Sequence, residues 1–472
     1  MNRPIRGVAV AAMVMFTALM VNLSYLYLGQ QGYLNERTEN RRVADARFAQ
    51  DRGPIMVGNT PIAKSEQVKD RYKFQRSYTS GELYAQVTGY YSYLYRTSGL
   101  EASYSSELSG VDDSQFLTRL IESASGATPQ GATLETTLSA KAQRAAVDGL
   151  AGRKGAVVAI DYSTGAIKAL VSLPSYDPND LATHDLTASS AAWKRLNADP
   201  DKPMANRATR EIYPPGSTFK LVTTAAALDS GLSPDSLIDA SAYKLPGSTR
   251  VITGNCGGTR ITLTRALEVS CNPAFARLGV KLGQDALRAQ AESFGFGTKF
   301  LDDIGSAASS FPEELDQAQT AMSAIGEFEV AASPLQMALV SASIANDGVV
   351  MDPYIVGRVL DSELRVTSQT QPQRQSVALS AENAAALRAM MVSVVQKGTG
   401  HRAQIAGVTV GGKTGTARSS NDRRPYAWFT AWADDPKIAV CVFIEDAEIP
   451  ATDIAGGTLA APIAKAVIEA LR

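Results

Sequence analysis

The segments that most restrict the fold are strand-like runs that stand far apart in the chain. Each is short, rich in β-branched or apolar residues and bounded by turn residues, as half-buried strands are. The five runs are Gly155–Asp161, Ala166–Ser172, Val408–Lys413, Tyr426–Ala433 and Lys437–Ile444. The first two flank Tyr162–Gly165, which is typical of a hairpin turn. With helical patterns between them and Ala460–Leu471 as a closing helix, these runs predict an antiparallel sheet with helices packed on it, an α+β fold.

The N-terminus carries an apolar run that is long enough to cross a membrane. Gly7–Leu28 follows Arg3 and Arg6, and about 20 apolar residues make a spanning helix. A cleaved signal peptide is the alternative, but the run is too long for one and no small-x-small cleavage site follows Leu28. We therefore expect an uncleaved anchor. The flanking basic residues do not decide its orientation, because several follow the run: Arg37, Arg41, Arg42 and Arg47.

Composition excludes several classes of protein. The 472 residues are 45% hydrophobic and 20% charged, which is ordinary for a globular chain of two or three domains. A net charge of −1 gives no electrostatic reason to expect a nucleic-acid partner. The only histidines are His184 and His401, and no cluster of Cys and His is present. We therefore expect neither a metal site nor a cofactor.

The stretch between the anchor and the first strand is polar and mixed, which predicts a small separate domain. Ser123–Gly131 is a linker rich in small residues, and Ala140–Leu150 reads as a short helix leading into the next domain. The expected units are a cytoplasmic tail with its anchor at 1–28, an N-terminal domain at 29–152 and a C-terminal domain at 153–472. The many tyrosines of the N-terminal domain could stack on sugar rings, but half-buried aromatics of short strands are the commoner case.

A turn followed by a helix in the C-terminal domain places a serine beside a lysine. Tyr213-Pro214-Pro215-Gly216 fixes the turn, and Ser217 opens an Ala- and Leu-rich helix that Gly231 can end. Lys220 lies on the same helix face, where its amine can reach the hydroxyl. Burial and the helix dipole would favour a neutral amine, giving a nucleophile with its base. The alternative is an N-cap serine with a solvated lysine. A second Ser-x-x-Lys, Ser241–Lys244, runs into a Pro-Gly pair and reads as loop.

Two further motifs favour the catalytic interpretation. Ser270-Cys271-Asn272 and Lys413-Thr414-Gly415-Thr416 follow in order, and the three motifs together mark penicillin-recognising serine enzymes. A rival Ser-x-Asn, Ser419-Ser420-Asn421, comes after the Lys-Thr-Gly and lacks a helix pattern. The chain resembles the class B penicillin-binding proteins, most closely the actinobacterial penicillin-binding proteins A. The resemblance implies a transpeptidase domain of the serine β-lactamase type with a five-stranded antiparallel sheet, preceded by a transmembrane helix and a small non-catalytic pedestal domain.

The resemblance also implies how the first two motifs work. Ser217 would attack the carbonyl of a D-Ala-D-Ala bond in a stem peptide and form an acyl-enzyme, while Lys220 takes the serine proton. Ser270 would relay a proton to the departing amine. An acceptor amine from a neighbouring strand would then resolve the acyl-enzyme.

The remaining motif residues are implied to bind the substrate. Asn272 would hold the peptide amide of the donor, and Lys413 would place a fixed positive charge beside its terminal carboxylate. Thr414 and Thr416 would hydrogen-bond that carboxylate, and Gly415 would leave the strand bare for a bound peptide. The N–H groups of the nucleophile and of Thr416 would form the oxyanion hole.

The implied activity is a peptidoglycan D,D-transpeptidase that β-lactams inhibit covalently. Three alternatives stay open: a D,D-carboxypeptidase, a β-lactamase and a non-catalytic cell-wall scaffold. A β-lactamase needs a deacylating carboxylate, and no Glu-x-x-Leu-Asn signature lies between Asn272 and Lys413. A scaffold would have lost a motif residue, and none is lost. Where the family usually has Gln after Ile-Gly, this chain has Glu327, to which the sequence assigns no role.

The implied partners follow from the size of the pedestal. About 120 residues are too few for an additional glycosyltransferase domain, so a separate membrane glycosyltransferase would polymerise the lipid-linked precursors. Divisome or elongation proteins are the further expected partners, and the sequence does not choose between septation and elongation. The expected location is the cell membrane, crossed once, with the catalytic domain extracytoplasmic.

Three cysteines predict one disulfide in an extracytoplasmic chain. Cys441 lies in an apolar strand pattern, where a buried thiol is the ordinary case. Cys256 lies in a glycine-rich loop and Cys271 lies inside the Ser-x-Asn motif. We therefore predict a bridge between Cys256 and Cys271 that ties the loop to the wall of the active site.

Overall fold

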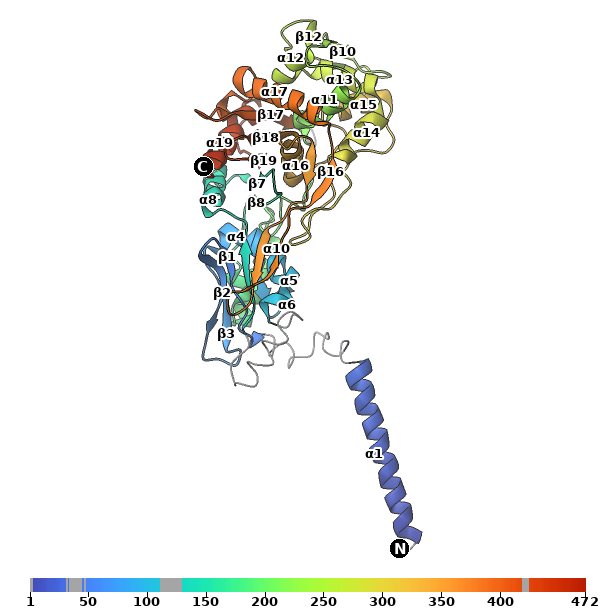
Figure 1. Cartoon of the computed structure of the whole chain (residues 1–472), viewed down its shortest axis with the longest axis vertical. Coiled ribbons are helices and arrows are strands. Elements are labelled where there is room, and N and C mark those ends of the chain that lie inside the picture. The colour runs from blue at the N-terminus through green and yellow to red at the C-terminus, as the bar shows by residue number, and fades with distance from the viewer. Residues whose placement is uncertain (1–2, 31–32, 34–44, 46–47, 111–129, 418–423) are drawn as a thin grey trace.

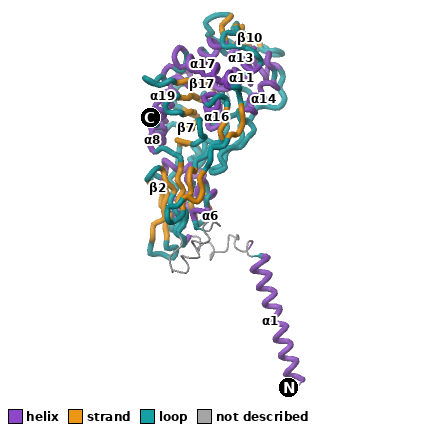
Figure 2. The backbone as a smooth tube through the Cα atoms, in the orientation of Figure 1, coloured by secondary structure: helices purple, strands orange, loops and turns teal. Residues whose placement is uncertain are grey.

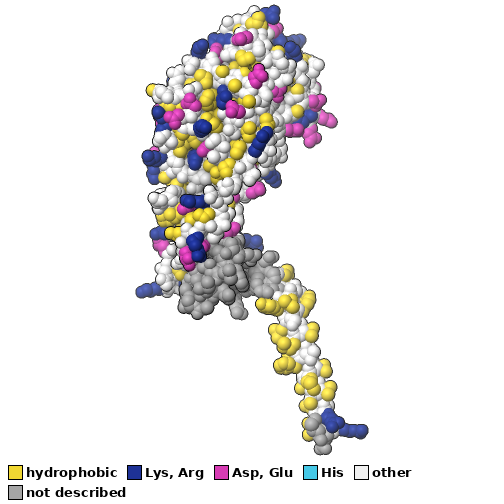
Figure 3. Space-filling model, in the orientation of Figure 1, with side chains coloured by type: hydrophobic (Ala, Val, Ile, Leu, Met, Phe, Trp, Pro, Cys, Tyr) yellow, Lys and Arg dark blue, Asp and Glu magenta, His cyan; other side chains and the backbone are white. Residues whose placement is uncertain are grey.

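The computed structural model describes residues 3–30, 33, 45, 48–110, 130–417 and 424–472. The basic residues at 37, 41, 42 and 47, most of the expected linker (123–129) and the rival motif at 419–421 lie outside them. Helix α1, Arg3–Gly29, has no buried residue, and within the described residues it is the one helix long and apolar enough to cross a membrane. Figure 3 shows hydrophobic side chains along the length of this helix and basic side chains near its N-terminal end. The predicted run Gly7–Leu28 thus forms a helix, as expected.

The five predicted strands form one antiparallel sheet, in the order β17-β18-β19-β7-β8. Their bounds are β7 Lys154–Asp161, β8 Ile167–Leu173, β17 Val410–Ala417, β18 Tyr426–Ala433 and β19 Ile438–Asp446. The hairpin β7–β8 joins the C-terminal strands through β19, with Val158 opposite Cys441. The α+β prediction is confirmed. Strand β17, which carries the Lys-Thr-Gly motif, lies at the edge of the sheet.

Helices cover both faces of this sheet, because each of its strands alternates apolar side chains between them. On one face Val157, Phe429 and Val442 share a core with α8 (Ala140–Leu150) and α19 (Ala461–Glu469). The other face packs on α16, Pro334–Ala345, whose residues are all buried. A helix without a polar face belongs in such an interior position. Figure 2 shows helices crowded around these strands in the upper body.

The helices that carry the motifs lie beyond α16. Helix α11, Lys220–Asp229, is buried from Lys220 through Leu228, so it forms the centre of this layer. Around it are α12 Leu263–Glu268, α13 Asn272–Leu282, α14 Gln284–Ser293, α15 Gln317–Ser323 and α17 Ala381–Lys397. Three short two-stranded ribbons complete this body: β9 Leu237–Asp239 with β12 Arg260–Thr262, β10 Tyr243–Lys244 with β11 Val251–Ile252, and β13 Val349–Met351 with β16 Arg374–Val377.

A second body, the pedestal, is built on a six-stranded sheet in the order β15-β14-β6-β1-β2-β3. Its strands are β1 Ile55–Val57, β2 Thr60–Gln67, β3 Phe74–Tyr78, β6 Thr133–Thr136, β14 Val356–Leu360 and β15 Val366–Gln369. Short helices pack beside them: α4 Gly81–Thr88, α5 Gly99–Ser103, α6 Ser105–Leu108, α9 Asn179–Ala182 and α10 Leu186–Ala198. Strands β14 and β15 come from the second half of the chain, so the pedestal is not continuous in sequence (Figure 1).

The pedestal contains a buried charged cluster, which we call the pedestal cluster: Arg52, Arg76 and Glu101. The exposed fractions of the three residues are 3%, 3% and 0%. Arg52 contacts one carboxylate oxygen of Glu101 at 2.8 Å, and Arg76 contacts the other at 2.5 Å. Tyr78 also donates to this carboxylate, at 3.2 Å. The two arginines hold the pKa of Glu101 below its usual range, although burial acts in the opposite direction.

Candidate active site

Ser217, the predicted nucleophile, lies in a tight turn between two other segments. Gly216–Phe219 forms a 3₁₀ turn that leads directly into α11, so Ser217 precedes the α-helix by one turn. Gly216 has φ +53°, and a Cβ there would lie 2.8 Å from the Thr416 carbonyl oxygen. The turn therefore packs directly on strand β17. Ser217 itself is half-buried. As predicted, Gly231 follows the end of α11 with φ +91°, and its N–H donates to the Leu228 carbonyl at 3.0 Å.

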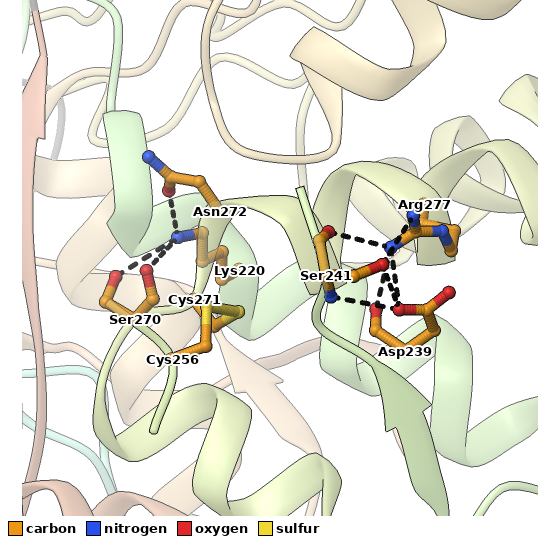
Figure 4. Close-up of a disulfide and its surroundings, with 8 residues drawn as sticks. All are labelled: Lys220, Asp239, Ser241, Cys256, Ser270, Cys271, Asn272 and Arg277. Atoms are coloured by element: carbon orange, nitrogen blue, oxygen red, sulfur yellow. Dashed lines mark hydrogen bonds and ion pairs between the residues drawn. A yellow bond between two sulfur atoms is a disulfide. The ribbon is translucent and has the colours of Figure 1, made fainter. Parts of the chain in front are cut away.

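The amine of Lys220 is fully buried and joins the first motif to the second. Its Nζ donates to the Ser270 carbonyl at 2.8 Å, to Ser270 Oγ at 3.1 Å and to Asn272 Oδ1 at 2.5 Å, as Figure 4 shows. Burial, and then the charge of Lys413, hold the pKa of Lys220 well below its usual range, while Glu327 opposes them. The helix spacing predicted that this amine would reach the hydroxyl of Ser217. Within the described residues, its hydrogen bonds go to the second motif instead.

Ser270 has an unusual backbone that follows from the end of α12. The N–H of Ser270 donates to the Leu267 carbonyl at 3.2 Å, and the N–H of Cys271 donates to the Ala266 carbonyl at 2.9 Å. This pair of bonds is a Schellman motif, whose left-handed position is usually glycine. Ser270 occupies it with φ +56°, a conformation that costs a non-glycine residue about 1 kcal/mol or more. The presence of serine at this position is therefore better explained by the chemistry of its side chain than by the preference of the backbone.

Lys413 reaches the same hydroxyl from β17. It is fully buried, and its Nζ donates to Ser270 Oγ and to the Thr414 carbonyl, both at 2.9 Å. The hydroxyl of Ser270 thus lies between two amines. Burial lowers the pKa of Lys413 to about 7. The family resemblance implies a fixed positive charge here, whereas a pKa near neutrality makes that charge depend on pH and on what is bound.

The other residues of this motif are brought to the same strand, but they differ in their surroundings. Thr414 is buried, and its hydroxyl lies 2.7 Å from that of Thr399, a partner that no sequence motif predicts. Thr416 is exposed at the sheet edge. A Cβ on Gly415 would lie 2.9 Å from the Pro215 carbonyl oxygen. Glycine is therefore needed at 415 because the nucleophile turn packs there, in addition to the expected role for a bound peptide.

The predicted disulfide is present. Cys256 and Cys271 are bonded, with their Cα atoms 5.2 Å apart. The bridge fixes the loop before β12 beside Ser270 and Asn272 (Figure 4). Cys441 is free and buried in β19, and burial raises the pKa of its thiol.

The rival Ser-x-x-Lys takes no part in this site. Ser241 Oγ donates to Asp239 at 2.6 Å, and Lys244 lies in the short strand β10. Figure 4 shows Ser241 grouped with Asp239 and Arg277, away from Lys220. The structure thus agrees with reading this segment as non-helical. Among the described residues there is no group of His, Cys, Asp and Glu that could hold a metal ion.

Comparisons with known proteins agree with this geometry. The penicillin binding protein transpeptidase domain matches residues 155–469, and the penicillin binding protein A dimerisation domain matches residues 52–134. The peptidoglycan D,D-transpeptidase PbpA of Mycolicibacterium smegmatis is 41% identical over 100% of this chain and 99% of its own length. The PbpA of Mycobacterium tuberculosis is 39% identical, with the same coverage.

Solved structures give the same assignment. Penicillin-binding protein A from M. tuberculosis, as a penicillin G acyl-enzyme complex, superposes with a TM-score of 0.85 at 40% identity, covering 89% of this chain and 99% of that one. An imipenem acyl-enzyme complex of the same protein gives a TM-score of 0.85 at 39% identity, covering 90% of this chain and 100% of that one. The chain therefore belongs to the class B penicillin-binding proteins, with a transpeptidase domain on a dimerisation-type pedestal.

Proposed function

We propose that the chain is a peptidoglycan D,D-transpeptidase in which Ser217 is the nucleophile and Lys220 is its base. The observation that carries the assignment is the Lys220 amine, which is buried one helical turn from Ser217 with its pKa well below the usual range. A neutral amine can accept the proton of the serine as the hydroxyl attacks the D-Ala-D-Ala carbonyl. Loss of D-alanine then leaves an acyl-enzyme, which an amine from a second strand resolves.

Ser270 is assigned the proton relay, because its hydroxyl bonds to the amines of both Lys220 and Lys413. It can give its proton to the departing D-alanine nitrogen and regain one from a lysine, so no unbalanced charge is left on the oxygen. Asn272, whose oxygen accepts from Lys220 at 2.5 Å, keeps its amide nitrogen for the donor peptide.

The Lys-Thr-Gly strand is assigned to the carboxylate end of the donor. Lys413 is protonated most readily when a carboxylate binds beside it, since an opposite charge raises the pKa of an amine. Thr414 and Thr416 can add hydrogen bonds to the carboxylate, and Gly415 leaves room for the turn that carries Ser217. The N–H groups of Ser217 and Thr416 then form the oxyanion hole, which is typically worth a few kcal/mol per donor.

The alternatives differ in how the acyl-enzyme ends. A D,D-carboxypeptidase would use water in place of the amine at the same acyl-enzyme. A β-lactamase would need a carboxylate to activate that water, and its usual signature is absent from the sequence. If the chain is a transpeptidase, we expect it to form a long-lived acyl-enzyme with β-lactams.

We further propose that α1 is a single membrane anchor with the catalytic domain extracytoplasmic. A disulfide beside the active site suits an oxidising compartment. Our proposed units are 1–28, 29–152 and 153–472, with residues 356–369 returning to the pedestal sheet and α9 and α10 packing beside it. Proposed partners are lipid-linked precursors, a separate membrane glycosyltransferase and divisome or elongation proteins.

Labelled penicillin tests the nucleophile. The full chain should gain one covalent adduct, which peptide mass spectrometry places on Ser217, and Ser217→Ala should abolish it. Ser241→Ala is the matched control, because Ser241 has the same Ser-x-x-Lys spacing and lies outside the site. Labelling that persists in Ser217→Ala, or is lost in Ser241→Ala, would refute the assignment.

A further inference from the structure

Glu327 is held against the turn that carries the nucleophile. The N–H of Gly216 donates to the Gly326 carbonyl at 2.9 Å, and Tyr213 and Ala332 exchange hydrogen bonds at 3.0 and 2.9 Å. A Cβ on Gly326 would lie 2.1 Å from the Gly216 carbonyl oxygen, so the two backbones are in direct contact. Glu327 follows at once, and its own N–H donates to the Met322 carbonyl at 3.1 Å. Its backbone is therefore fixed beside Ser217 and does not belong to a free loop.

Among the described residues, the carboxylate of Glu327 has one ion pair and no closer charged partner. That pair is with Arg250, at 3.7 Å, which is too long for a hydrogen bond. The exposed fractions of the two side chains are 34% and 62%, and exposed pairs of this kind contribute about 0–1 kcal/mol. An incoming cation can thus displace Arg250 at little cost.

The ion pair between Arg250 and Glu327 links the segment that carries Ser270 to the segment that carries Ser217. Arg250 lies in the turn between β10 and β11, and the Cys256–Cys271 bridge fixes the loop that follows β11 to the second motif. Glu327 belongs to the segment that supports the nucleophile turn. Arg250 and Glu327 therefore meet where the side that carries Ser270 approaches the side that carries Ser217.

The charge of the site changes during the proposed reaction. The donor brings a carboxylate to Lys413, but that carboxylate leaves with D-alanine. The acceptor must then bring a primary amine, which is a cation in neutral water, toward two lysine side chains. Glu327 is the carboxylate whose charge acts on Lys220. It can offset the repulsion between the protonated form of Lys413 and the incoming ammonium group.

On this basis, and resting on the transpeptidase function proposed above, we propose that Glu327 recognises the ammonium group of the acceptor peptide, with Arg250 as the partner it exchanges. The ammonium gives one proton to water and becomes a neutral amine. Its nitrogen then forms the new amide bond as the bond between the acyl carbon and Ser217 Oγ breaks. The second proton of the nitrogen passes through Lys220 to Oγ, so the step is balanced. A glutamine at 327 would keep the shape of the side chain and lose the attraction for a cation.

Two acceptors with different charge test the proposal. Acyl-enzyme is formed from a donor peptide ending in D-Ala-D-Ala, and aminolysis and hydrolysis products are measured against acceptor concentration. Nα-acetyl-lysine amide supplies an ammonium group without a carboxylate, and O-methylhydroxylamine supplies an amine that is uncharged at the assay pH. In Glu327→Gln, we expect the use of the lysine acceptor to fall about tenfold relative to O-methylhydroxylamine, the size of a lost charge-assisted contact.

The matched control is Glu329→Gln, which removes an exposed carboxylate two residues away. We expect its ratio of the two acceptors to equal that of the unsubstituted chain. Equal loss of both acceptors in Glu327→Gln would mean that Glu327 acts only through Lys220, and an unchanged ratio would mean that it binds no acceptor. Either result would overturn the proposal. Failure of the transpeptidase function itself would look different, because then the unsubstituted chain would either form no acyl-enzyme or release it by hydrolysis alone, with no aminolysis product from either acceptor.

Discussion

The pedestal cluster and the two lysines of the candidate site, Lys220 and Lys413, are both buried groups that can carry charge, yet their surroundings act on that charge in opposite ways. In the pedestal, Glu101 is bonded to two arginines, and its charged form is stabilised. In the catalytic domain, Lys220 and Lys413 share only the hydroxyl of Ser270, and burial lowers the pKa of each. A buried ionised group that is paired with opposite charges keeps its protonation state and stabilises the fold. Unpaired buried charge gives up its proton, which is what a base needs.

Replacing Lys220 by Arg should give the largest effect, because it makes the catalytic charge permanent. A guanidinium stays protonated and cannot accept the proton of Ser217. We expect the second-order rate of acylation by labelled penicillin to fall by about 10²- to 10⁴-fold, the usual contribution of a general base. Thermal unfolding followed by circular dichroism should show a folded chain. Acylation within a few-fold of normal would mean that Lys220 contributes only its charge.

Removing the carboxylate of the pedestal cluster should cost stability and not catalysis. Glu101→Gln leaves Arg52 and Arg76 buried without a counter-ion, which typically destabilises by about 3–5 kcal/mol. Acylation at Ser217 should persist at temperatures where the variant is folded, because no catalytic residue touches this cluster.

Glu135→Gln is the control for the pedestal substitution. Glu135 pairs with Arg358 at 2.6 Å on the same sheet, but their side chains are 31% and 49% exposed. Loss of such a pair should change the free energy of unfolding by less than about 1 kcal/mol. Equal destabilisation by the two substitutions would mean that burial of the pedestal cluster makes no additional contribution to the free energy of unfolding.

The disulfide is the covalent support of the catalytic cluster, and the pedestal cluster has no counterpart to it among the described residues. Replacing both Cys256 and Cys271 by Ser should lower the free energy of unfolding by roughly 3 kcal/mol on the chain-entropy model for a loop of this length. Acylation should slow as well if the bridge keeps Ser270 in register. Cys441→Ala, which leaves the bridge intact, is the control. Unfolding of the double variant at the wild-type midpoint would show that the loop is held by packing alone.

What the sequence could predict is local. Strand periodicity located all five strands of the catalytic sheet, and helix composition located α8 and the end of α11. The three motifs predicted Ser217, Lys220 and Ser270 as candidate catalytic residues, because the chemistry depends on residue type and spacing. The disulfide followed from compartment and cysteine count.

What the sequence could not predict depends on contacts between distant segments. Strand β14 pairs with β6, more than two hundred residues upstream, so its place in the pedestal depends on a distant partner. Strand β15 is exposed throughout and carries no apolar pattern. The left-handed backbone of Ser270 depends on how α12 ends. The lowered pKa of Lys413 depends on burial by the whole domain. Arg250 and Glu327 meet only because the loop after β10 folds back toward the nucleophile turn.

The smallest expected effect is the change in the free energy of unfolding per unit of pH. The two clusters should differ in the pH range over which this change occurs. The pKa of Lys413 is about 7 in the folded chain against 10.5 for an ordinary lysine. Between these values the unfolded chain carries one more proton than the folded chain, so the free energy of unfolding should rise with pH by up to about 1.4 kcal/mol per unit. Below pH 7 and above 10.5 this contribution should be flat.

Glu101 should behave differently, because its pKa is lowered from 4.5. Its stabilisation is complete above that value and is lost as the pH falls through the folded pKa. Denaturant unfolding of the full chain and of Lys413→Met, compared from pH 5 to 10.5, isolates the lysine, since the difference between them should change only above about pH 7. A difference that is constant over this range would mean that Lys413 stays protonated when folded. The fixed positive charge expected from the sequence would then be correct, and the contrast between the two clusters would rest on Lys220 alone.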